Sequence, residues 1–340
     1  MNSSVGNLDV GVVVIGRNEG ERLRQCLLSV VRPGRAVVYV DSGSSDGSVE
    51  MARAMNVDVV ELPTTQGFTA ARARNVGLQR LHTKSPDLQF VQFVDGDCVV
   101  DERWIDTARA AFEEFPKAAI VCGRRRERYP DRSVYNALCD LEWNTPIGEA
   151  SECGGDAMMR ILPIVAVGGF NPQLIAGEEP ELCVRVRAAG WVIRRVDAEM
   201  TLHDANMLYF AQWWKRNLRA GHAFAEGSHL HGKTFDHWNR QTRSNWVWGL
   251  VMPTCMLIVA KATNGLSLAV MCGLYVTLMV KVYISGRRRG QDQQCAQRNA
   301  LFCVLGKMPQ MLGQTKFMLG RFRGRQATLI EYKSIEPAAN

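Results

Sequence analysis

Two aspartates that lie one residue apart, Asp95 and Asp97, follow the apolar run of residues 88–94. In an extended chain, residues i and i+2 point the same way, so both carboxylates are expected to meet at the end of a buried strand. Like charges this close repel each other unless a cation lies between them, and a hard divalent ion such as Mg²⁺ or Mn²⁺ suits that place. Such an ion suits diphosphate chemistry. The alternative is a simple turn, because Asp-Gly is common in turns.

A second acidic group is the segment Glu178-Glu179-Pro180-Glu181. Pro180 suits the first turn of a helix, and acidic residues there complement the helix dipole. The functional interpretation is general base catalysis, in which a carboxylate removes the proton of a hydroxyl group as its oxygen attacks. The residues alone leave both interpretations open.

Short apolar strands alternate with helical patterns through the first hundred residues. This alternation predicts a parallel sheet that helices cover on both faces, with ligands bound at the carboxyl ends of its strands. Polar residues follow three of the four expected strands: Asn18 and Glu19, Asp41, and the Asp95/Asp97 pair. The strands are expected at residues 10–15, 36–40, 57–62 and 88–94, and the helices at 21–31, 48–55 and 70–81.

From about residue 8 to residue 205, these motifs together resemble a family 2 glycosyltransferase with the GT-A fold. Each motif is weak alone, but all occur in the family's order and at plausible spacing. The resemblance implies a Rossmann-like, mostly parallel α/β sheet flanked by helices. The segments that carry it are residues 14–19, 40–48, 73–77, 95–97, 154–160, 167–170 and 177–182.

The resemblance implies that Asn18, Glu19, Asp41 and Arg74 bind the nucleotide of a nucleotide-diphosphate sugar, together with Asp95. The residues themselves also suit other roles. Asp41 opens a serine-rich segment that could cap a helix, and Asn18 and Glu19 could do the same. Arg72 and Arg74 point about 200° apart on a helix, so at most one faces the site, and the family pattern favours Arg74.

The resemblance also implies a metal site and a catalytic base. Asp95 and Asp97 would hold Mg²⁺ or Mn²⁺, with His203 as a third ligand; a surface histidine after a strand is the alternative. Glu179 stands where the family usually has aspartate as the base. Its longer side chain departs from that pattern, so Glu178 is the substitute candidate. A single, inverting displacement follows from the resemblance alone.

Charge and hydrophobicity both change after residue 205. Residues 1–205 carry 23 Lys and Arg against 29 Asp and Glu, whereas residues 206–340 carry 18 against 5. An acidic half followed by a basic tail indicates an anionic surface as partner and no nucleic acid. Two apolar segments in the tail, 246–260 and 265–280, have Arg or Lys on both outer sides. They predict a hairpin with both ends cytoplasmic that spans or lies on a membrane, a buried hairpin being the alternative.

Four regions follow from these observations. We expect a nucleotide-sugar transferase domain over 1–205, basic amphipathic connecting helices over 206–245, the hydrophobic hairpin over 246–285, and a basic amphipathic tail over 286–340. Aromatic and basic side chains in the flanking regions suit a headgroup layer and a lipid-linked acceptor. The segment 212–216, Gln-Trp-Trp-Lys-Arg, only roughly matches the signature of processive members, which argues against a polymerising synthase.

The predicted protein is therefore a metal-dependent glycosyltransferase at the cytoplasmic face of the inner membrane, acting on a lipid-linked or saccharide acceptor in polysaccharide or cell-envelope synthesis. A catalytically inactive scaffold remains an alternative, as does a nucleotidyltransferase, although residues 16–19 lack the Gly-rich phosphate loop and its lysine. A phosphatase with an Asp-x-Asp nucleophile is a further alternative, but that aspartate usually follows the first strand, whereas Asp95 follows the fourth. Ten dispersed cysteines without a C-x-x-C pair indicate neither a disulfide framework nor a structural zinc site.

Overall fold

The computed structural model describes residues 9–63, 65, 67–232 and 236–324. It separates into two compact units, residues 1–131 with 139–206, and residues 132–138 with 207–340. The chain up to residue 203 forms β1 (Val10–Gly16), α1 (Glu21–Val30), β2 (Val37–Asp41), α2 (Ser48–Ala54), β3 (Asp58–Glu61), α3 (Ala70–Lys84), β4 (Phe90–Asp95), β5 (Cys98–Val100), α4 (Trp104–Glu114), β6 (Ala118–Glu127), η1 (Pro130–Arg132), α5 (Val134–Glu142), β7 (Gly148–Ala150), β8 (Met158–Arg160), α6 (Ile161–Ala166), α7 (Glu178–Ala188) and β9 (Val192–His203).

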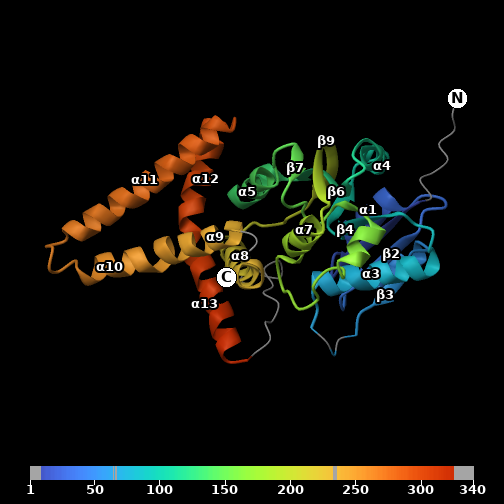
Figure 1. Cartoon of the computed structure of the whole chain (residues 1–340), viewed down its shortest axis with the longest axis horizontal. Coiled ribbons are helices and arrows are strands. Elements are labelled where there is room, and N and C mark those ends of the chain that lie inside the picture. Colours follow the sequence, from blue (N-terminus) through green and yellow to red (C-terminus); the bar gives the residue numbers. More distant parts are fainter. Residues whose placement is uncertain (1–8, 64, 66, 233–235, 325–340) are drawn as a thin grey trace. The chain divides into compact units, whose positions relative to one another are not determined.

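The first unit is built on one mixed sheet with the strand order β3-β2-β1-β4-β8-β6-β9-β5, and β7 pairs with β9 (Figure 1). Strands β3, β2, β1 and β4 are parallel, and β8 is antiparallel to β4. The alternating strands and helices predicted for the first hundred residues are confirmed, and so is the mixed α/β class. Valine-rich β1 and β4 are buried along nearly their whole length, as strands covered on both faces must be.

The parallel strands end together at one edge of the sheet. Ile15 pairs with Asp95, and Gly16 pairs with Asp41, so the polar residues after β1, β2 and β4 share that edge. The chain reverses direction across the sheet between β3 and β4. Because such crossovers are right-handed, α3 covers the face opposite to α1 and α2, and it crosses in front of β2 and β3 in Figure 1.

Strand β9 brings the last predicted site residue to this region. It pairs antiparallel with β5 and parallel with β6, so that His203 stands opposite Cys98 on one side and Glu127 on the other. Position 203 is therefore fixed by two neighbouring strands, and its side chain lies beside the aspartate that precedes β5.

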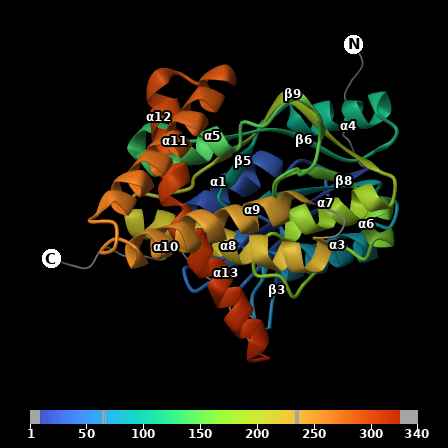
Figure 2. The ribbon, with the colours of Figure 1, turned by 60° about the vertical axis from the view of Figure 1, so that its left-hand side comes forward.

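The second unit is helical (Figure 2). Helices α8 and α13 cross at a close approach, because an added Cβ at Gly221 would lie 1.9 Å from the carbonyl oxygen of Gln310, and one at Gly313 would lie 2.0 Å from that of Leu218. Only glycine fits at these two positions. The helices are α8 (Phe210–His231), α9 (Asp236–Trp246), the π-helical turn η2 (Val247–Val251), α10 (Met252–Ile258), α11 (Leu266–Arg288), α12 (Gln293–Leu305) and α13 (Lys307–Phe322).

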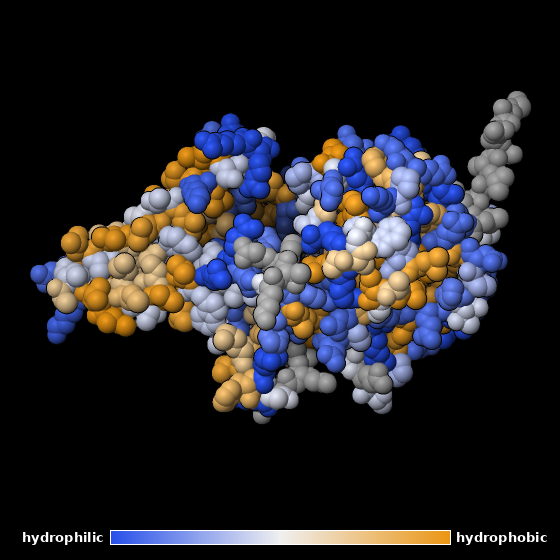
Figure 3. Space-filling view, viewed as in Figure 1, coloured by the Kyte–Doolittle hydropathy of each residue, from blue (hydrophilic) through white to orange (hydrophobic). Residues whose placement is uncertain are grey.

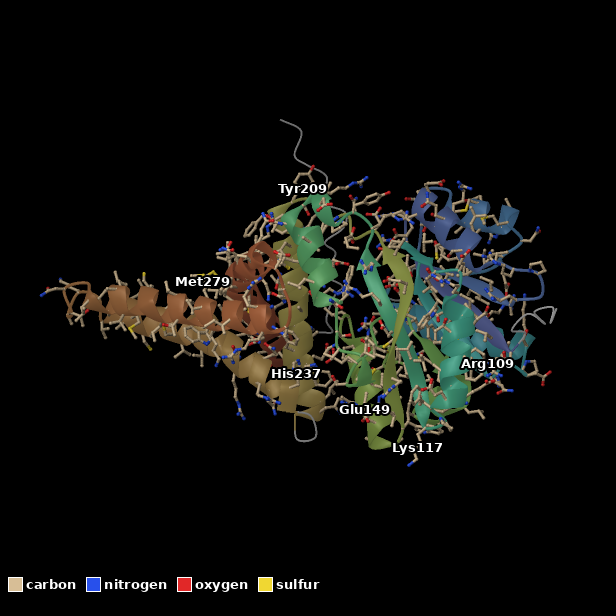
Figure 4. The ribbon with its side chains drawn as sticks, turned by 90° about the horizontal axis from the view of Figure 1, so that it is seen from above. Arg109, Lys117, Glu149, Tyr209, His237 and Met279 are labelled. Carbon is tan, nitrogen blue, oxygen red and sulfur yellow. The ribbon has the colours of Figure 1, made fainter. Side chains whose placement is uncertain are left out.

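The two predicted apolar segments fall on η2 with α10 and on α11, which lie side by side and join through residues 259–265 (Figure 4, where Met279 marks α11). Apolar side chains gather over this end of the unit (Figure 3). Within the described part of the chain, one helix, α11, is long and apolar enough to cross a membrane. The first segment lies at the end of a continuous helical run, residues 236–258, in which the π-helical turn η2 joins α9 to α10. Residues 325–340, the last part of the predicted tail, lie outside the described residues.

A tight helix–sheet contact at Gly77 gives a test of this fold. A Cβ at Gly77 would lie 2.4 Å from Val13 Cγ1, so α3 rests directly on β1. We expect Gly77→Ala to lower the free energy of unfolding by about 1–3 kcal/mol through overpacking, although alanine ordinarily favours a helix interior. Chemical denaturation of the purified chain measures the change.

Two further variants make this result specific. Val13→Ala removes the opposing methyl groups, so Gly77→Ala is expected to cost less in that background than in the wild type. Gly273→Ala on α11, where nothing lies within 4 Å, is the control and should not destabilise the protein. Equal costs of Gly77→Ala in both backgrounds would contradict this packing.

Candidate active site

A buried charge network surrounds Asp95 at the end of β4. Arg74 on α3 donates from Nη2 to Asp95 Oδ1 (2.8 Å) and from Nη1 to Glu178 Oε1 (2.8 Å), while Arg125 on β6 donates from Nη2 to Asp95 Oδ2 (3.2 Å). Burial acts to raise the pKa of Asp95, but the guanidinium groups of Arg74 and then Arg125 outweigh it and hold the pKa below its usual range. Asp95 is therefore an ionised group with a cation at each oxygen.

A third aspartate, Asp156, is hydrogen-bonded to two members of this network, Asp95 and Arg125. Its Oδ1 accepts the backbone N–H of Asp95 (3.0 Å), and its Oδ2 accepts Arg125 Nε (2.7 Å) and Thr201 Oγ1 (3.0 Å). The side chain is fully buried. Burial acts to lower the pKa of Arg125, but Asp156 and the other anions raise it well above its usual value. The sequence assigned no role to Arg125 and none to Asp156 beyond its place in a family motif.

The second aspartate of the pair lies against the histidine. His203 Nε2 is 3.4 Å from Asp97 Oδ2, and on the other side of the ring Nδ1 is 3.7 Å from Glu127 Oε2. Both Asp97 and His203 are buried, and the ring packs against Trp143 with centroids 4.7 Å apart. Trp143 also lies beneath the Arg125 guanidinium.

Asp97 and His203 form a donor set that fits a divalent metal ion. A carboxylate oxygen and an imidazole nitrogen suit Mn²⁺ as well as Mg²⁺, and a carboxylate behind the far ring nitrogen, as Glu127 is, commonly orients a metal-binding histidine. The Sγ of Cys98 lies in the same group of ligand atoms, all within 4.8 Å of one another. Asp95 fits less directly, because both of its oxygens already face arginines.

The Asp41 carboxylate accepts hydrogen bonds from the loop that follows β2. Its Oδ2 accepts the N–H groups of Gly43 and Ser44 (2.8 Å each), and its Oδ1 accepts the hydroxyl of Tyr39 (2.7 Å). Asn18 joins the same loop, because its N–H donates to Ser44 Oγ (2.9 Å) and its side-chain oxygen accepts the N–H of Ser45 (2.8 Å). Asp41 thus holds its own loop, whereas the N-cap of α2 is Gly47 without a side-chain cap; the nucleotide-binding role of Asp41 stays a prediction.

Glu19 remains close to this loop and to the Asp95 strand. It pairs with Arg22 (2.7 Å), and its side chain lies under the backbone of Gly96. The strand ends therefore bring Asn18, Glu19 and Asp41 to one edge with Asp95, as the sequence predicts, and Arg74, rather than Arg72, points into it.

The two candidate bases at the start of α7 have different surroundings. Glu178 is paired with Arg74, as described above. Glu179 Oε1 accepts the N–H of Cys153 (2.7 Å) and lies 3.1 Å from Cys153 Sγ and 2.9 Å from Cys183 Sγ. Both carboxylates are buried. Glu178 belongs to the Asp95 network, whereas Glu179 contacts Cys153 and Cys183.

Sequence comparisons find glycosyltransferases that are similar to this chain. Residues 11–155 match the sequence model of glycosyl transferase family 2. Glycosyltransferase AglE from Haloferax volcanii is 24% identical over 227 residues, which are 62% of this chain and 71% of AglE. Pre-mycofactocin glycosyltransferase from Mycobacterium tuberculosis is 28% identical over 216 residues, and these are 59% of this chain and 44% of that protein's length.

A solved structure is similar over most of the chain. Mannosyltransferase PcManGT from Pyrobaculum calidifontis, determined in complex with GDP-Man and Mn²⁺, gives a TM-score of 0.63 at 14% identity and covers 91% of this chain and 87% of its own. At this identity the likeness concerns the fold alone, and it confirms the fold predicted from the sequence.

Two adjacent arginines of β6 test the buried network. Arg125 meets Asp95 and Asp156, whereas Arg126 makes an ion pair with Glu199 in which both side chains are about half exposed. Arg125→Gln leaves Asp156 buried without its cation, so we expect it to lower the free energy of unfolding by about 3–5 kcal/mol. Arg126→Gln is the matched control, with an expected loss of about 0–1 kcal/mol. Urea denaturation measures both, and equal losses would count against the network as described.

Proposed function

We propose that this chain, which is a family 2 glycosyltransferase, transfers a sugar from a nucleotide-diphosphate donor to an acceptor hydroxyl with the help of a divalent metal ion. The observation that carries this proposal is the Asp97–His203 pair at the carboxyl edge of the sheet, next to the Asp95 network. The pair offers an oxygen and a nitrogen ligand where the parallel strands end, which is where open α/β sheets bind ligands.

Asp97 and His203 would hold Mg²⁺ or Mn²⁺, with Asp95 as the neighbouring carboxylate. When bound, the ion offsets negative charge on the departing nucleoside diphosphate. The Mn²⁺ in the mannosyltransferase with the same fold supports this proposal. Glu127 orients the histidine from the far side of the ring, and Trp143 holds the ring in place by packing.

Donor binding is proposed for the residues that share this edge. The loop held by Asp41 and Asn18, together with Glu19, would contact the nucleoside, and Arg74 would face the diphosphate. Arg74 is suited to the last role because it is a fully charged, buried guanidinium that can exchange a carboxylate for a phosphate oxygen in the same geometry.

Proton transfer from the acceptor is proposed for Glu179. Its Oε1 is bound by an N–H group and two thiols, whereas Glu178 forms an ion pair with Arg74. A carboxylate whose partners are neutral gives them up more readily than one that must leave a guanidinium. Direct attack of the activated hydroxyl on the anomeric carbon inverts its configuration.

A membrane-bound acceptor is proposed from the second unit. In the apolar window of helix α11 only 6% of the residues are buried, and the helix ends in Arg287 and Arg288. Arginines that follow an apolar helix favour the cytoplasmic side of a membrane, so we place the enzyme at the cytoplasmic face of the inner membrane. A lipid-linked or polysaccharide-precursor acceptor presented at that surface fits the location.

The first experiment screens donors on the detergent-solubilised full chain. We expect one of the UDP-, GDP- or dTDP-sugars to bind and to release its nucleoside diphosphate only with Mn²⁺ or Mg²⁺. Asp97→Asn should lower the rate about 100-fold or more, since metal stabilisation is worth several kcal/mol, and should abolish metal-dependent donor binding in calorimetry. Asp197→Asn, an exposed residue of the same strand as His203, is the control.

Each other outcome has a definite meaning. Absence of donor binding and of release across the panel would contradict the proposed reaction. Turnover that survives Asp97→Asn would leave the transferase in place and remove the metal assignment.

The base assignment has its own test. Glu179→Gln is expected to lower kcat by about 10²–10⁴-fold, the usual contribution of a general base, with little change in donor affinity. Glu178→Gln deprives Arg74 of a partner and should act mainly on donor affinity. Transfer rates and donor Kd values for the two variants separate these effects. A wild-type rate in Glu179→Gln with a large loss in Glu178→Gln would assign the base to Glu178.

A further inference from the structure

Two thiols and a carboxylate form a compact cluster at the start of α7. Glu179 and Cys183 are four residues apart on this helix, and such residues lie on one face. Cys153 comes from the irregular segment between β7 and β8. The two Sγ atoms are 3.6 Å apart, and they lie 3.1 Å (Cys153) and 2.9 Å (Cys183) from Glu179 Oε1. All three side chains are buried.

These separations are close to those of three ligands on one tetrahedral metal ion. With metal–sulfur bonds of about 2.3 Å and metal–oxygen bonds of about 2.1 Å, tetrahedral angles put two sulfur ligands about 3.8 Å apart and a sulfur and an oxygen about 3.6 Å apart. The sulfur–sulfur distance of 3.6 Å needs almost no change, and the sulfur–oxygen distances need to open by less than about 0.8 Å. The three side chains are therefore close to the arrangement that a tetrahedral metal ion requires.

The ligand types select a different kind of ion from that expected at Asp97 and His203. Thiolates favour zinc and other thiophilic ions, whereas carboxylates favour magnesium and manganese. Cys153 retains 8% exposure and lies on a segment without regular secondary structure.

We propose that Cys153, Glu179 and Cys183 form a second metal site, which takes a thiophilic divalent cation of the Zn²⁺ class and thereby inhibits sugar transfer. On binding, two metal–sulfur bonds and one metal–oxygen bond form, and the two thiol protons leave to solvent. The hydrogen bonds from the thiols to Glu179 are lost. The three anionic ligands leave the site with one net negative charge and an open fourth position for water.

Inhibition follows because the metal occupies the carboxylate that removes the acceptor's proton. This part rests on the proposed function, whereas the metal site itself does not. The cell's supply of Mn²⁺ or Mg²⁺ and of Zn²⁺ would then act on the same enzyme in opposite directions, through two sites of different ligand hardness.

The binding test uses the reduced, detergent-solubilised full chain after removal of metal with EDTA. We expect added Co²⁺ to produce cobalt–thiolate charge-transfer absorption at one equivalent, and Zn²⁺ to displace it. Cys153→Ser and Cys183→Ser should each remove most of this absorption and weaken Zn²⁺ binding at least about 100-fold, since changes outside a ligand shell alone cost 10–100-fold. Cys122→Ser, which removes a buried thiol of β6 outside the trio, is the matched control.

Two results would overturn the site: no thiolate absorption in the wild type, or absorption that persists in both serine variants. Circular dichroism checks that the variants are folded, and Cys153→Ser leaves helix α7 itself unaltered.

Activity supplies the second readout. In excess Mn²⁺, one equivalent of Zn²⁺ should slow transfer by the wild type and leave Cys183→Ser unaffected. Cobalt–thiolate absorption without inhibition would overturn the inhibitory role while the site stands. Absence of transfer from every donor before zinc is added would count against the proposed function, and the cobalt measurement would still decide the site.

Discussion

The concentration of negative charge at one edge of a buried sheet is the constraint on which the rest of the site depends. Asp95, Asp97 and Asp156 come together where water is scarce, and isolated charges there would be very costly. Arg74 and Arg125 offset this charge from opposite sides of Asp95. The approach is close enough that a Cβ at Gly155 would lie 2.6 Å from Arg74 Nη2. Helices α3 and α7 and strands β4 and β6 are thereby tied to one point.

Much of the first unit could be predicted from sequence, because its signal is local. Short valine-rich runs followed by polar residues identified β1, β2 and β4 and the edge where Asp41 and Asp95 lie. Arg125 could not be told apart from its two neighbouring arginines by residue type. Side chains alternate in direction along a strand, and this alternation could have distinguished it. Arg124 and Arg126 pair with Asp140 and Glu199, while Arg125 between them faces the buried aspartates.

Contacts between segments that are distant in the sequence could not be predicted from local sequence patterns. Cys153 is 26 residues from Glu179, and nothing in the spacing of the cysteines marks it as a partner. The absence of a C-x-x-C pair argues against the common zinc motifs, but a tertiary contact can assemble metal ligands without any motif. The apolar tail shows a further limit, since the π-helical turn η2 lies within the helical run of residues 236–258 and is absent from α11.

The order of these elements along the chain has a consequence for biosynthesis. The first unit ends at residue 206, apart from a short segment that belongs to the second, and α11 begins at Leu266. At about 5–20 residues per second, a ribosome needs roughly 3–12 s to translate the interval, whereas mixed α/β domains fold faster than that. The sheet and its charged edge can therefore form before the most apolar helix exists. Folding of the first unit and synthesis of α11 become separate events in time.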